Sequence, residues 1–138
     1  MAKSREPAVK ATDSEKITVN LGYVDLGQID LLVQEGFYGN RTDFIRAAIR
    51  AQIARHGEAV DKSVARHRLD LGLRRFTRKD LEAAKAAGEM LHLQVLGLVS
   101  IASDVTPTLA RETIASLRVL GALQADPSIK AALADRIL

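Results

Sequence analysis

The chain has 138 residues, of which 47% are hydrophobic, so it can form one domain or two small ones with a buried core. It contains no cysteine, which excludes disulfides and thiol chemistry and fits a reducing cytoplasm. Residues 1–16 lack an apolar signal segment, and no apolar run reaches the ~18 residues that a membrane span needs. We therefore expect a cytoplasmic protein without membrane contact.

The net charge of +3 is unevenly distributed along the chain. Residues 58–80 contain seven Lys or Arg against four Asp or Glu, whereas residues 81–138 contain five against six. A basic region suits a polyphosphate partner, but a solvated surface explains the same charge. The charge distribution alone therefore does not distinguish a surface that binds polyphosphate from a solvated one.

Residues 16–21 (KITVNL) alternate strictly between polar and apolar side chains, which is typical of a strand with one buried face. Ile17, Val19 and Leu21 would point to one side of this strand. A lone strand leaves its backbone groups unpaired and cannot bury an apolar face by itself. We expect it to pair with the same strand of a second chain.

Two helices are expected to follow the strand. Asp25 and Gln28 have the spacing of a capping box for the first helix, and Gly36 is expected to end it. Asn40 is a suitable N-cap for the second helix, and Asp43 would favour its positive end. The second helix is expected to direct its apolar side chains inward; these are Phe44, Ile45, Ala48, Ile49, Ala51 and Ile53.

The order strand, helix, turn (GFYGNRTD) and helix within residues 16–56 resembles the ribbon-helix-helix family of DNA-binding proteins, of the CopG, Arc and MetJ type. The resemblance rests on this ordered series and on the NRTDFIRAAIR opening of the second helix. It implies a homodimer whose paired strands form an antiparallel ribbon in the DNA major groove. It does not extend to residues 57–138.

The resemblance also assigns DNA contacts by position. Lys16, Thr18 and Asn20 become the base-reading side chains, and the backbone N–H groups at Asn40, Arg41 and Thr42 would hold a phosphate. Lys, Thr and Asn can read the donor and acceptor pattern of the major groove, which agrees with this assignment. The alternative is that the three strand residues are only a solvated face.

Further phosphate contacts could come from outside the strand. Residues 1–15 show no periodicity and are expected to form a flexible arm beside the ribbon. Its basic residues Lys3, Arg5 and Lys10 could lie along the DNA backbone, as could Arg46 in the second helix. An inert terminus is the alternative for the arm.

Residues 57–68 are expected to form a helical linker, because Val60 and Val64 follow a helical spacing. The densest basic cluster of the chain starts in this linker; its members are Arg66, Arg68, Arg74, Arg75, Arg78 and Lys79. These residues could contact phosphates or form a solvated face.

Residues 69–138 contain an internal repeat. Residues 93–99 (LQVLGLV) recur 24 residues later as 117–123 (LRVLGAL), with a weaker trace at 69–73. A helix-start signal follows each copy, at Asp80, at Thr106 with Pro107 and at Asp126 with Pro127. The pattern predicts three strand–helix units.

The arrangement of these units follows from their composition. Near-continuous apolar strands separated by helices predict parallel pairing with buried faces, and the fixed period indicates a small solenoid-like stack. A chance similarity between two buried strands is the alternative. Gly97 and Gly121, inside the strands, are expected to permit close packing or a bulge. With the amino-terminal part, this gives an α+β fold.

The sequence offers little catalytic or metal-binding chemistry. The histidines, His56, His67 and His92, are scattered, and nickel-sensing domains of ribbon-helix-helix regulators need clustered His and Cys residues. There is no nucleophile motif or phosphate-binding glycine-rich loop. We expect no cofactor, no metal and no enzymatic activity.

Two functional hypotheses remain. The first is a DNA-binding repressor or regulator whose residues 69–138 assemble dimers and so make binding cooperative. The second is an antitoxin-like or adaptor protein whose carboxy-terminal part binds another protein. The apolar repeated strands favour the first, because they predict a module that folds before it meets a partner.

Overall fold

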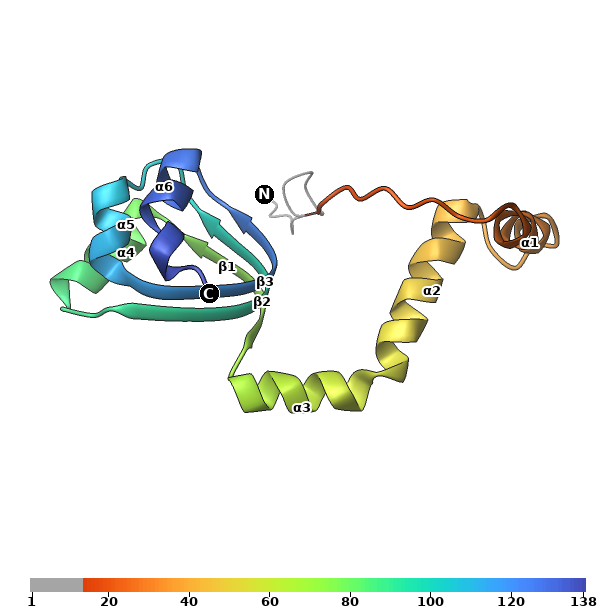
Figure 1. Cartoon of the computed structure of the whole chain (residues 1–138), viewed down its shortest axis with the longest axis horizontal. Coiled ribbons are helices and arrows are strands. Elements are labelled where there is room, and N and C mark those ends of the chain that lie inside the picture. Colours follow the sequence, from red (N-terminus) through yellow and green to blue (C-terminus); the bar gives the residue numbers. More distant parts are fainter. Residues whose placement is uncertain (1–13) are drawn as a thin grey trace, which may run out of the picture. The chain divides into compact units, whose positions relative to one another are not determined.

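A computed structural model describes residues 14–138 and shows two compact units, Ser14–Ser63 and Val64–Leu138. We call them the amino-terminal and the carboxy-terminal unit. In chain order the elements are α1 (Tyr23–Gln34), α2 (Arg41–Arg55), α3 (Gly57–His67), β1 (Asp70–Phe76), α4 (Arg78–Ala86), β2 (Leu91–Ile101), α5 (Pro107–Thr113), β3 (Ile114–Gln124), α6 (Pro127–Ala132) and a 3₁₀ turn, η2 (Ala134–Arg136) (Figure 1). The fold is α+β. No helix within residues 14–138 is long and apolar enough to cross a membrane.

Helix α1 begins three residues earlier than the sequence predicts. Its N-cap is Gly22, which has no side chain to cap the helix, and Asp25 lies in the first turn instead of starting it. The predicted capping box of Asp25 and Gln28 is therefore wrong. The other end is as predicted, because Gly36 follows the helix with φ 89°, a conformation that glycine adopts without a steric penalty.

Helix α2 begins as predicted. The Asn40 side chain accepts a hydrogen bond from the backbone N–H of Asp43 at 2.8 Å, which satisfies one of the unpaired donors of the first turn. Tyr38 in the preceding turn packs edge-on against Phe44, with ring centroids 5.1 Å apart. These contacts fix the turn against the start of α2.

The carboxy-terminal unit contains a parallel sheet in the order β1-β2-β3. Its register aligns the repeat: Leu93 pairs with Leu117, and Gly97 pairs with Gly72 on one side and Gly121 on the other. The prediction of three strand–helix units with parallel pairing is therefore confirmed.

The three aligned glycines have φ angles between 124° and 142°, which side chains rarely permit. A Cβ on Gly97 would lie 2.1 Å from the Gly72 carbonyl oxygen, and one on Gly121 would lie 2.0 Å from the Gly97 oxygen. Glycine is thus required for the close approach of these strands, as the sequence predicts.

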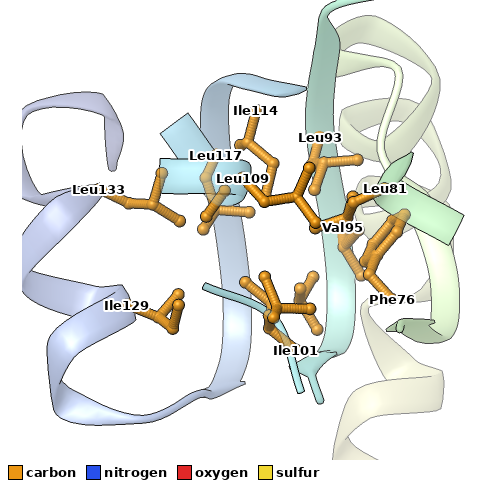
Figure 2. Packing of buried hydrophobic residues seen from close by; sticks show 13 residues of the cluster. Phe76, Leu81, Leu93, Val95, Ile101, Leu109, Ile114, Leu117, Ile129 and Leu133 are labelled. Carbon is orange, nitrogen blue, oxygen red and sulfur yellow. The ribbon is translucent and has the colours of Figure 1, made fainter. Parts of the chain in front are cut away.

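Helices α4, α5 and α6 lie together on one side of the sheet (Figure 1). The core fills the space between them and the strands, and Figure 2 shows side chains from both layers meeting there. Its completely buried side chains include Leu81, Val95, Ile114, Leu117 and Leu133.

The opposite face of the sheet is not covered by a helix of the carboxy-terminal unit. Leu71 and Leu73 in β1 are 67% and 65% exposed, and Leu120 in β3 is 48% exposed. The prediction of strands with buried faces is therefore wrong for this side of β1 and β3, whereas Leu98 in the central strand β2 is buried, with 7% exposed. The reason is that all three helices cross over the same face.

Local signals place two of the three helix starts in this unit. Thr106 and Asp126 precede α5 and α6 as predicted, each with a proline in the first turn. Helix α4 differs, because its N-cap is Thr77 and Asp80 is the third helical residue. The two side chains form a reciprocal capping box, in which Asp80 accepts from the Thr77 N–H at 2.9 Å.

Candidate nucleic-acid interface

The segment before α1 has no strand pairing in the single chain. Residues 15–22 carry no regular secondary structure, and Lys16, Thr18 and Asn20 are all exposed. The apolar residues between them are exposed as well: Ile17 by 73%, Val19 by 67% and Leu21 by 42%. Both sets of side chains of this alternating segment are thus available to a partner.

The amino-terminal unit has almost no core of its own. Ile29 is the only residue buried among those described from 14 to 63. The apolar residues of α2 that were expected to point inward remain exposed or half-buried in the single chain; Ile45, Ile49 and Ile53 are 37%, 51% and 58% exposed. A unit of this size cannot be stable with one buried side chain, so its apolar surface requires a covering partner.

A shallow hollow of about 480 Å³ lies beside the alternating segment. Val19, Leu21, Tyr23 and Leu26 line it, together with Asn20 and Gly22. Its lining is largely apolar and it adjoins the unpaired backbone, so it can receive side chains of an added strand.

The start of α2 presents backbone donors. Asn40 caps the N–H of Asp43, while the N–H groups of Arg41 and Thr42 precede the first residues that can bond within the helix. Such donors, together with the positive end of the helix dipole, form a suitable site for a phosphate. Arg46 is exposed one turn after Thr42.

The Arg41 side chain is occupied by a contact that the sequence did not reveal. Its Nε and Nη2 donate to the two carboxylate oxygens of Asp30 at 2.7 and 2.8 Å, a bidentate pair between α2 and α1. These hydrogen bonds hold the pKa of the Asp30 carboxyl below its ordinary value. Arg41 can therefore offer its backbone N–H to a phosphate while its side chain fixes the angle between the helices.

Other predicted contacts are less well placed or cannot be placed. Lys3, Arg5 and Lys10 lie outside the described residues. In the basic cluster, Arg74 pairs with Asp70 at 3.1 Å and lies over the Phe76 ring, and Arg78 pairs with Glu82 at 3.0 Å. These two side chains are thus engaged within the carboxy-terminal unit.

The histidines do not converge on a common site. Helix α2 ends at Arg55 and α3 begins at Gly57, so His56 and His67 do not share one continuous helix. Among residues 14–138 no group of three or more His, Asp or Glu side chains could hold a metal ion.

A family model described as the "Ribbon-Helix-Helix transcriptional regulator family" matches residues 12–130. The chain belongs to the ribbon-helix-helix transcriptional regulator family. The match includes most of the carboxy-terminal unit, so the family covers much more of the chain than the resemblance of residues 16–56. No curated protein and no solved structure matches the chain.

This ribbon-helix-helix assignment identifies the protein as a DNA-binding transcriptional regulator. Regulators of this kind typically bind DNA as dimers.

Proposed function

We propose that the protein is a homodimeric regulator that reads a specific duplex sequence through a ribbon formed by residues 16–21 of two chains. The observation that supports this most strongly is the alternating segment, which has unpaired backbone and exposed apolar side chains beside a unit with one buried residue. Pairing two such segments buries Ile17, Val19 and Leu21 and leaves Lys16, Thr18 and Asn20 on the opposite face.

The exposed polar face then enters the major groove, which admits a two-stranded ribbon. Lys16 would contact guanine, Asn20 would bind adenine and Thr18 would offer its hydroxyl or methyl group. The N–H groups at Asn40, Arg41 and Thr42 would fix the ribbon on the backbone by binding a phosphate on each side. In this arrangement the protein acts as a repressor or autoregulator and carries out no catalysis.

The carboxy-terminal unit has a three-stranded parallel sheet and a core of its own. We propose that it associates with other copies and makes dimers bind neighbouring half-sites cooperatively. A compact unit with a core of its own supports this role better than a tail that folds only on a toxin or another partner protein.

Replacement of Lys16, Thr18 and Asn20 by alanine tests the ribbon. The variant should remain a folded dimer, because these side chains lie opposite the apolar face, but should lose sequence preference. Each base contact contributes ~1 to 3 kcal/mol of discrimination. Binding to a selected duplex and to a scrambled duplex, at one stated salt concentration, measures the loss.

A matched control replaces Lys130 and Thr108 by alanine, which removes one charge and one hydroxyl from exposed positions in the carboxy-terminal unit. This variant should keep its preference for the selected duplex. If the triple variant discriminates between the duplexes as well as the control does, residues 16–21 do not read the DNA.

A further inference from the structure

The uncovered face of the parallel sheet is apolar along two rows of the register. Leu71, Leu96 and Leu120 form one row, and Leu73, Leu98 and Ala122 form the other. Leu71, Leu73 and Leu120 in the outer strands are exposed, whereas Leu98 in the central strand is only 7% exposed. The glycines at positions 72, 97 and 121 lie between the rows. Core residues such as Val95 and Val99 alternate with these residues along β2, so the two rows point away from the helices.

The size of this face limits its possible occupants. Three strands about 4.8 Å apart, over five or six residues of about 3.3 Å each, give an area on the order of 300 Å² per copy. A specific complex of free proteins buries about 800 Å² per partner. The face is too small to hold a free partner by itself, so its occupant must be kept nearby by another connection.

The proposed ribbon dimer supplies such a connection. It joins two copies of the carboxy-terminal unit through their chains, which raises the effective concentration of each unit near the other to the order of millimolar. We propose that the open sheet face of one copy packs against the same face of the second copy in the ribbon dimer. This inference rests on the homodimer proposed above.

The register indicates how two such faces would fit. We place a two-fold axis between the two sheets, above β2 and parallel to the strands. Both β1 strands then begin at the same end, where each chain arrives from its amino-terminal unit. Leu96 then meets Leu96 of the second copy, while Leu73 faces the smaller Ala122. Arg75 faces Gln124 of the second copy, so the positively charged Arg75 side chains of the two copies do not face each other.

The absence of cysteine allows a direct test in the full-length chain. Leu96→Cys places one thiol on the expected axis. Ala83→Cys is the matched control, because Ala83 is exposed on α4, which covers the opposite face. Under mild oxidation Leu96→Cys should form the disulfide-linked dimer at least about tenfold faster than Ala83→Cys, since tethered thiols on one axis meet repeatedly.

A second variant covers the case in which Leu96→Cys does not fold, as judged by circular dichroism. Leu73→Cys with Ala122→Cys puts two thiols in strands that are two spacings apart, about 9.6 Å, too far for a disulfide within one chain. It should therefore cross-link only between copies.

Sedimentation under reducing conditions separates this inference from the function on which it rests. A reduced protein that is monomeric contradicts the homodimer itself. If the reduced protein is dimeric but Leu96→Cys cross-links no faster than Ala83→Cys, the sheet faces do not meet and only the present inference fails. If oxidation of Leu96→Cys links dimers into tetramers instead of linking the two copies within a dimer, the inference also fails, because the sheet faces then meet between dimers.

Discussion

Asn40 has two proposed roles at the start of α2, and one substitution can separate them. Its side chain caps the helix by accepting from the Asp43 N–H at 2.8 Å, and its backbone is expected to help hold a DNA phosphate. Asn40→Ala removes the cap and should lower the free energy of unfolding by about 1 kcal/mol. Thermal unfolding at a fixed protein concentration measures this, since a dimer's stability depends on concentration.

Asn40→Asp should keep the stability of the helix but weaken DNA binding. Aspartate caps a helix as well as asparagine does, so the unfolding temperature should stay close to that of the unchanged protein. The added negative charge would lie beside the phosphate, so affinity should fall for selected and scrambled duplexes alike. Unchanged affinity of Asn40→Asp would place the phosphate elsewhere.

Residue-scale signals were reliable where one local interaction decides the structure. The sequence predicted the N-cap positions Asn40, Thr106 and Asp126. The side chains of Asn40 and Thr106 accept a hydrogen bond from the first turn of their own helices, whereas that of Asp126 makes no capping hydrogen bond. It misplaced the starts of α1 and α4, because aspartate is favourable both at the N-cap and within the first turn. Asp25 and Asp80 occupy the first turn. The Asp30–Arg41 pair joins two helices, and no local pattern reveals such a contact.

At the scale of an element, the three aligned glycines differ in what surrounds them. An alanine Cβ at Gly97 or Gly121 would overlap a carbonyl oxygen of the neighbouring strand, whereas nothing lies within 4 Å of one at Gly72. All three have positive φ, so each alanine substitution should cost ~1 to 3 kcal/mol in backbone strain. Gly97→Ala and Gly121→Ala should cost ~1 to 3 kcal/mol more through overpacking.

Denaturant unfolding of the three single variants checks this order. Gly72→Ala is the internal control, because it changes the backbone conformation without a steric overlap. Equal losses for Gly72→Ala and Gly97→Ala would mean that the strands do not approach as closely at this row as the register indicates.

The repeat predicted the strands and their parallel order, but not which face of the sheet the helices cover. A near-continuous apolar strand has leucine or valine on both sides, so its sequence does not distinguish a covered face from an open one. In β2, Val95 and Leu96 are both apolar. Only Val95 belongs to the core under the helices.

At the scale of the whole molecule, the two units have different requirements for a partner. The carboxy-terminal unit has a core of its own, whereas the amino-terminal unit buries only Ile29 among its described residues. The amino-terminal unit, where we propose that the DNA is read, therefore needs a covering partner more than the carboxy-terminal unit does. The alternating segment predicts such a partner too, because a lone strand cannot satisfy its backbone.

Removal of residues 69–138 tests whether the carboxy-terminal unit couples neighbouring dimers. The shortened chain keeps the whole ribbon-helix-helix region, so it should remain a dimer and bind a single site with nearly unchanged affinity. On a duplex with two adjacent sites, the full chain should bind the second site about 5- to 150-fold more tightly than the first, the usual range of coupling between sites. The shortened chain should bind both sites independently.

Titrations of one-site and two-site duplexes at the same salt concentration measure this coupling, and sedimentation reports the particle size in each case. The one-site duplex is the control for any loss of intrinsic affinity. If the shortened chain binds the two-site duplex as steeply as the full chain does, coupling arises in the ribbon-helix-helix region. The carboxy-terminal unit would then serve only contacts within a dimer, where we propose that its open sheet face pairs with that of the second copy.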